Sequence, residues 1–188
     1  MSGDGTPEST PLRAAWIVVP VAVVMVLFIA LLATRDTGDA GFASFSLEGQ
    51  VAPAIVGTTI DDQPFDLDDF RGRFVVLNFF QTTCIPCVQE HPELVSFQND
   101  YAPSGFATVV SVAFDDRPSN LRDFFDRFGG DWPVLASDTG SIIVDYGVPL
   151  VPESIVIAPN GEVIKKLRGG IGQNDLEFVI AEWQEANA

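Results

Sequence analysis

Cysteine is almost absent from this chain, whose 188 residues contain two, Cys84 and Cys87. One pair cannot build the multi-disulfide framework of small secreted domains, and a single histidine, His91, leaves a Cys/His metal site without a fourth ligand. Basic residues are also few: 10 Lys and Arg stand against 26 Asp and Glu, a net charge of −16. This balance disfavours nucleic acid and anionic lipid and would attract basic partners, although solubility alone also accounts for it.

The two cysteines lie between an apolar run and a segment with helical spacing. Residues 74–80 have the composition of a strand buried on both faces, and apolar residues recur at helical intervals from Cys84 to Tyr101. A Cys-x-x-Cys pair at the junction of a strand and a helix is typical of a thiol–disulfide redox motif. Free N–H groups and partial positive charge at a helix start stabilise a thiolate, so Cys84 is the expected attacking sulfur. Cys87, one turn further on, is placed to resolve the mixed disulfide.

Three other interpretations of the cysteine pair are possible. A purely structural disulfide would close a loop of four residues and contribute only about 2 kcal/mol. Cys84, Cys87 and His91 have the spacing of one helical face and could hold zinc or copper, but nothing nearby completes a closed tetrahedral site. A peroxidase would use one cysteine to attack peroxide. The strand and the helix start around the pair favour the redox dithiol.

The N-terminal part of the chain contains one long apolar segment. Residues 14–33 are twenty uncharged, mostly aliphatic positions, enough to cross a bilayer. They predict a transmembrane anchor, with 1–13 as a cytoplasmic tail, 34–48 as a linker and 49–188 as the folded domain. A cleaved signal peptide is the alternative, disfavoured by the length of the segment and by the lack of a small-x-small cleavage site. Redox cysteines after a single span predict a cell-membrane protein whose domain faces the extracytoplasmic side, where thiols cycle with disulfides.

Strands and helices are expected to alternate along the remainder of the chain. The C-terminal segment is an amphipathic helix, which Asn174 and Glu177 are expected to cap. The expected strands are 54–60, 65–67, 74–80, 107–114, 133–136, 154–158 and 162–167, and the other expected helices are 119–128 and 142–146. This order predicts an α/β sandwich in which helices flank a mixed central sheet.

This organisation resembles the thioredoxin superfamily. Within it, the chain is similar to the membrane-anchored TlpA/ResA/CcmG (DsbE) branch of bacterial thiol–disulfide oxidoreductases. Two runs carry the likeness: Cys-x-Pro-Cys-x-x-Glu-x-Pro at 84–92 and Gly-Val-x-x-x-Pro-Glu-Ser at 147–154. It extends over residues 50–188 and implies a thioredoxin-like fold.

The resemblance also implies catalytic roles for three residues. Cys84 would be the nucleophile and Cys87 the resolving thiol. Glu90 would be a partly buried acid whose raised pKa lets it exchange a proton with Cys87; the alternative is an ordinary solvated carboxylate. His91 is expected to be partly exposed, with a minor role in tuning Cys87.

Four further residues are implied to bind substrate. Pro152 matches a cis-proline that lies against the dithiol, and Val151 before it would pair with the substrate backbone. Glu153 matches an acidic residue that follows this proline, with a surface loop charge as the alternative. Thr83 stands where the family usually has tryptophan, which changes the expected substrate surface.

The implied activity is dithiol–disulfide exchange with protein substrates, without a cofactor or a metal. The branch favours the reducing direction, in which the haem-attachment cysteines of apocytochrome c are kept as thiols by electrons from a membrane thiol-transfer protein. Formation of disulfides in exported proteins is the alternative, because direction depends on the potentials of the partners. A non-catalytic metal-binding or chaperone module is the alternative from another class.

Overall fold

The computed structural model describes residues 20–28, 47–136 and 139–188. The chain forms two units, Met1–Ser44 and Phe45–Ala188. Of the predicted anchor 14–33, residues 20–28 are helical and the others lie outside the described residues, as do the predicted tail 1–13 and most of the linker. Within the described part of the chain, no helix combines the length and the apolar character that a membrane crossing needs.

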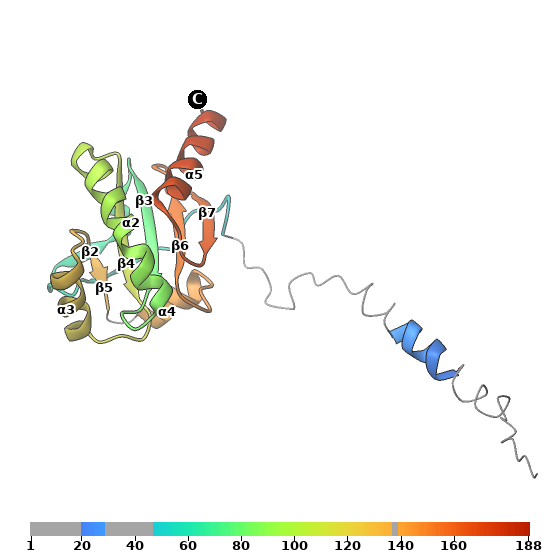
Figure 1. The fold of residues 1–188 in the computed structure, drawn as a ribbon. Coiled ribbons are helices and arrows are strands. Elements are labelled where there is room, and N and C mark those ends of the chain that lie inside the picture. The colour runs from blue at the N-terminus through green and yellow to red at the C-terminus, as the bar shows by residue number, and fades with distance from the viewer. Residues whose placement is uncertain (1–19, 29–46, 137–138) are drawn as a thin grey trace, which may run out of the picture. The chain divides into compact units, whose positions relative to one another are not determined.

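A five-stranded mixed sheet forms the centre of the second unit (Figure 1). The central strand β3 (Phe74–Phe80) pairs in parallel with β4 (Ala107–Ala113) on one side and antiparallel with β6 (Glu153–Ile157) on the other, which confirms the predicted mixed sheet. In spatial order the strands are β5 (Val134–Leu135), β4 (Ala107–Ala113), β3 (Phe74–Phe80), β6 (Glu153–Ile157) and β7 (Val163–Arg168).

Helices and a small hairpin surround this sheet. The two strands predicted before the central strand are present and pair as a separate two-stranded sheet. The helices are α2 (Ile85–Tyr101), α3 (Pro118–Phe128), α4 (Thr139–Asp145) and α5 (Gln173–Ala186), with short 3-10 turns η1 (Leu67–Phe70) and η2 (Ala102–Ser104), and the hairpin consists of β1 (Val56–Thr58) and β2 (Pro64–Asp66).

The central strand β3 is covered on both faces. Its side chains alternate, so Val76 and Phe80 enter a core with residues of α2, α3 and α5, whereas Leu77 and Phe79 enter a second core with Tyr146 just after α4. All seven β3 residues are buried, as the apolar run predicts.

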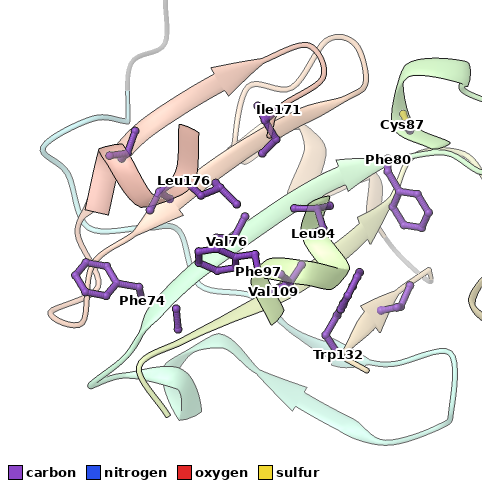
Figure 2. Packing of buried hydrophobic residues seen from close by; sticks show 14 of the residues in the cluster. Phe74, Val76, Phe80, Cys87, Leu94, Phe97, Val109, Trp132, Ile171 and Leu176 are labelled. Carbon is purple, nitrogen blue, oxygen red and sulfur yellow. The ribbon is translucent and has the colours of Figure 1, made fainter. Parts of the chain in front are cut away.

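Helix α2 is held against the sheet by its apolar face. Leu94 and Phe97 are almost fully buried, and Figure 2 shows them beside Val76 of β3 and Val109 of β4. Pro92 lies inside α2, which nevertheless runs as one helix from Ile85 to Tyr101. This packing fixes the helix whose first turn carries the cysteines.

The predicted cap of the C-terminal helix is wrong. Helix α5 begins at Gln173, and its first turn is closed by Asp175, whose Oδ2 accepts a bond from the Gly172 N–H at 2.8 Å. Glu177 instead accepts a bond from the Tyr101 hydroxyl at 2.9 Å. The acid of the capping pair therefore lies two residues earlier than the sequence pattern indicates.

Replacing phenylalanine by alanine is expected to change the free energy of unfolding by very different amounts at two positions, one on α2 and one on α5. Phe97→Ala should lower the free energy of unfolding by about 3–5 kcal/mol, because Phe97 is fully buried between α2 and the sheet. Phe178→Ala on α5 should change it by less than about 0.5 kcal/mol, because Phe178 is 69% exposed. Denaturant unfolding followed by circular dichroism measures both, and equal losses would contradict the described core.

Candidate active site

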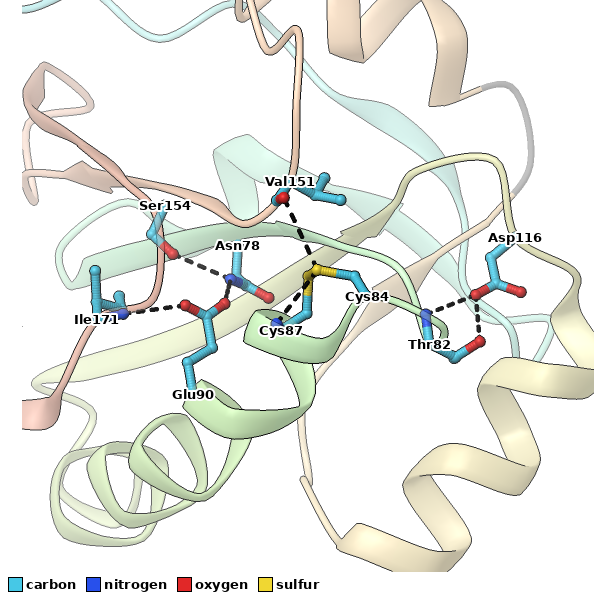
Figure 3. Close-up of a disulfide and its surroundings, with 9 residues drawn as sticks. All are labelled: Asn78, Thr82, Cys84, Cys87, Glu90, Asp116, Val151, Ser154 and Ile171. Atoms are coloured by element: carbon cyan, nitrogen blue, oxygen red, sulfur yellow. Dashed lines mark hydrogen bonds between the residues drawn. A yellow bond between two sulfur atoms is a disulfide. The ribbon is translucent and has the colours of Figure 1, made fainter.

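The cysteine pair lies at the N-terminus of α2, as predicted. Cys84 is the N-cap residue in an extended conformation, and its Sγ accepts a bond from the Cys87 N–H at 3.3 Å. Cys84 and Cys87 are joined in a disulfide (Figure 3). Pro86 in the first turn suits a helix start, since its missing N–H needs no partner there. In the reduced protein the same N–H would stabilise a Cys84 thiolate.

The two sulfurs differ in their access to solvent. Cys87 is buried at 2% exposure, whereas Cys84 is only half-buried. Thr83, Ile85 and Pro86 around it are exposed. An incoming disulfide can therefore reach Cys84 but not Cys87, which is the order of attack that the sequence predicts.

The predicted proline lies beside this disulfide. The Val151–Pro152 peptide bond is cis, and the Val151 carbonyl oxygen lies 3.8 Å from Cys84 Sγ (Figure 3). Pro152 is buried and Val151 half-buried. The structure thus brings together segments that are 67 residues apart in the sequence.

Glu90 is more deeply buried than predicted. It is 3% exposed, and its carboxylate accepts bonds from Asn78 Nδ2 at 2.8 Å and from the Ile171 N–H at 3.2 Å. Burial raises the pKa of Glu90 to about 7, against the lowering effect of the two bonds. A carboxyl group one turn beyond Cys87 can therefore both take up and release a proton near neutral pH.

Two polar residues of the site were missed by sequence reasoning. Asn78 of β3 faces Ser154 of β6 in the sheet register, and Asn78 Nδ2 donates to Ser154 Oγ at 3.1 Å as well as to Glu90. The signal was present, because Asn78 is the single polar residue in the apolar run 74–80. Buried polar side chains need partners, so its presence there indicates a bonded network.

The loop before Cys84 is tied to the start of α3. The backbone N–H and the hydroxyl of Thr82 both donate to Asp116 Oδ2, at 2.8 and 2.5 Å. Asp116 Oδ1 accepts bonds from the Arg117 N–H and from Asn120. Burial alone would raise the pKa of Asp116, but the four bonds together lower it. This second contact was also missed, since it joins residues 34 apart.

The predicted exposure of His91 is wrong. The ring is buried, with Nε2 lying 2.8 Å from the Gly129 carbonyl oxygen, and it packs on Phe124, Phe125 and Trp132. Burial lowers the pKa of His91. The contact of Nε2 with Gly129 joins the ring to the C-terminal end of α3. Among the residues that the structure describes, no three His, Cys, Asp or Glu side chains are grouped so that they could hold a metal ion.

Glu153 is not on a surface loop but at the start of β6. Its side chain is 4% exposed and forms ion pairs with Lys166 Nζ at 2.8 Å and with Arg168 Nε at 3.4 Å. Its predicted contact with substrate stays a prediction, and the structure shows that both carboxylate oxygens already face cations.

A thioredoxin-like α/β fold with a Cys-x-x-Cys disulfide at a helix start defines the class of thiol–disulfide oxidoreductases. Residues 47–180 match the model of the Redoxin family, and the chain belongs to this family. Within it, the relatives support the TlpA/ResA/CcmG branch.

Two curated relatives and one solved structure illustrate the similarity. The thiol-disulfide oxidoreductase ResA of Bacillus thuringiensis is 31% identical over 129 residues, covering 69% of this chain and 74% of the relative. ResA of Geobacillus thermodenitrificans is 29% identical over 161 residues, covering 82% and 92%. A Chlorobium tepidum structure described as the thiol:disulfide interchange protein DsbE superposes with a TM-score of 0.65 at 27% identity, covering 72% of this chain and 96% of that one.

The raised pKa of Glu90 predicts a dependence of stability on pH. Between its ordinary value of 4.5 and about 7, folded Glu90 holds a proton that the unfolded chain releases. The stabilisation is therefore complete below pH 4.5 and is lost as the pH rises through 7. Relative to Glu90→Gln, the oxidised protein should lose on the order of 3 kcal/mol between pH 4 and pH 8. Denaturant unfolding of both proteins at these pH values measures it, and parallel pH profiles would show that Glu90 titrates normally.

Proposed function

We propose that this oxidoreductase reduces disulfides of exported proteins while anchored to the membrane by residues 14–33. The observation that carries the proposal is the asymmetry of the dithiol: an accessible Cys84 sulfur at a helix start lies in front of a buried Cys87. In such a site the accessible sulfur attacks the substrate disulfide, and the buried sulfur then resolves the mixed disulfide.

The reaction proceeds in two exchanges. The Cys84 thiolate attacks one sulfur of the substrate disulfide, so a mixed disulfide forms and one substrate thiolate leaves. Cys87 then attacks Cys84 Sγ, the mixed disulfide breaks, and the second substrate thiolate is released. The substrate gains two electrons and the protein ends with the Cys84–Cys87 disulfide that the structure contains.

Glu90 serves as the proton acceptor for Cys87 in the second exchange. A buried thiol resists ionisation, so removal of its proton needs a nearby base. Glu90 follows Cys87 by one helical turn, and with a pKa of about 7 it is a matched base at neutral pH. Asn78 and the Ile171 N–H hold its carboxylate in place.

Substrate binds along the surface beside Cys84. Val151 offers its backbone there, and the cis-proline Pro152 after it lies beside the dithiol. The exposed Thr83 adds a hydroxyl, and Glu153 follows the proline at the start of β6. The exposed Ile85 and Leu150 give this surface an apolar character. An extended segment of a protein carrying a disulfide fits it better than a small molecule does.

The reducing direction and the substrate follow from the resemblance to the TlpA/ResA/CcmG branch. Apocytochrome c cysteines would be the thiols that the protein maintains on the extracytoplasmic side of the cell membrane, and a membrane thiol-transfer protein would return its electrons. The apolar segment 14–33 supports the anchoring.

A trapping experiment tests the order of attack. Cys87→Ala should accumulate mixed disulfides between Cys84 and its substrates, because the resolving thiol is missing. Cys84→Ala should accumulate none, since the remaining cysteine is buried. Mass spectrometry after acid quenching and thiol blocking identifies the adducts. Equal trapping by both variants, or by neither, would refute the assignment.

The equilibrium redox potential tests the direction. We expect a value closer to the about −270 mV of thioredoxin than to the about −120 mV of DsbA, because a reductant must lose its electrons readily. Titration of the full chain in dithiothreitol buffers, with alkylation and mass spectrometry as readout, gives the value. A potential near that of DsbA would instead support disulfide formation.

A further inference from the structure

Lys166 is a nearly buried lysine whose ammonium group lies close to three oxygen atoms. Its side chain lies on β7 and is 11% exposed. Nζ lies 2.8 Å from Glu153 Oε2, 2.5 Å from the Gly147 carbonyl oxygen and 3.2 Å from that of Tyr146. Nζ donates hydrogen bonds to the two carbonyl oxygens, whereas its contact with Glu153 is an ion pair without hydrogen-bond geometry. Burying a charge is costly unless it is paired in this way.

The three oxygen atoms lie at the two ends of one short segment. Gly147 immediately precedes residues 148–152, which we call the proline loop, and Glu153 immediately follows them. One ammonium group therefore joins the entry and the exit of the loop that carries Val151 and Pro152.

The other contacts of the proline loop show which part of the loop depends on Lys166. Val148 is buried in the core at one end, and the Gly169 N–H donates to the Pro152 carbonyl oxygen at 2.9 Å at the other. Between them Leu150 is 74% exposed, and the Val151 carbonyl faces Cys84. The part of the loop that faces the dithiol is thus set by its fixed ends.

The second cation near Glu153 is a weaker partner. Arg168 Nε lies 3.4 Å from Glu153 Oε1, and the arginine side chain is 63% exposed. Solvent screens such a contact, whereas the contact with Lys166 lies in the interior. Arg168 pairs with Glu153 at the exit of the loop, whereas Lys166 donates to the carbonyls before the loop, so Arg168 cannot replace the connection that Lys166 forms.

We propose that Lys166 is a positioning residue that holds the proline loop in the conformation that receives a protein substrate. The proposal rests on the substrate site described above and extends it to a residue that contacts neither the sulfurs nor the substrate. Small thiols react directly with the Cys84–Cys87 pair and do not need the proline loop for binding. Loss of Lys166 should therefore weaken the reaction with protein disulfides and leave that with small thiols intact.

The adjacent Lys165 provides a matched control. Its side chain is 50% exposed, and its Nζ lies 3.7 Å from Glu48 at the surface. Lys165→Met and Lys166→Met remove the same charge and add the same side chain at neighbouring positions of β7. They differ in that Lys166→Met alone removes the contacts that connect the two ends of the proline loop.

The experiment uses the full chain with a protein electron acceptor, disulfide-bonded insulin, and a small-molecule electron donor, dithiothreitol. Lys166→Met should raise KM for disulfide-bonded insulin by about 10- to 100-fold, because a displacement of the loop of about 1 Å misplaces the substrate. Its kcat, its redox potential and its rate of reaction with dithiothreitol should stay within about twofold of the parent chain, since the sulfurs are untouched. Lys165→Met should match the parent chain throughout, and Lys166→Arg should recover part of the KM.

Three outcomes separate the possibilities. A Lys166→Met variant that is less stable but has the parent KM would show a purely structural ion pair and overturn the proposal. Failure of the parent chain itself to exchange with dithiothreitol would overturn the proposed function instead. If Lys166→Met does not fold, Glu153→Gln with Lys166→Met removes both charges, and an unchanged KM in that double variant would equally overturn the proposal.

Discussion

The site depends on one bond at the start of α2, from the Cys87 N–H to Cys84 Sγ. It places the half-buried Cys84 sulfur at the positive end of a helix, where the thiolate is the favoured form. The bond lies within the first turn of α2, and Leu94 and Phe97 further along the helix hold α2 against the sheet through the core. Apolar packing thus places the sulfur at the edge of the sheet, and the helix start determines its favoured ionisation state.

Behind the dithiol, burial and hydrogen bonding act on Glu90 in opposite directions. Burial alone would keep the carboxyl neutral, and the bonds from Asn78 and the Ile171 N–H favour its ionised form. Their balance leaves a pKa of about 7, which is what a group needs in order to accept and return a proton in each cycle. Replacing Asn78 by an apolar residue would remove one of the bonds that keep this value from rising further.

Local patterns were sufficient to predict the sheet, the helix start and the dithiol. The run 74–80 and the Cys-x-x-Cys spacing each act within a few residues. What they could not predict depends on register and on packing between distant segments. Asn78 meets Ser154 across 76 residues, Thr82 meets Asp116 across 34, and Lys166 reaches back 20 residues to Tyr146. The exposure predicted for His91 was wrong for the same reason, since the ring is covered by aromatic residues of α3 and its following loop.

The two halves of the site meet in a pair of consecutive residues. Glu153 and Ser154 follow Pro152 directly and, as neighbours in a strand, point to opposite faces of the sheet. Ser154 joins the network of Asn78 and Glu90 beneath α2, while Glu153 joins Lys166 on the other face. The end of the proline loop at β6 is therefore held by contacts on both faces of the sheet. Contacts on both faces restrict rotation of this strand end about its axis, and they thereby favour the position of the Val151 carbonyl beside Cys84.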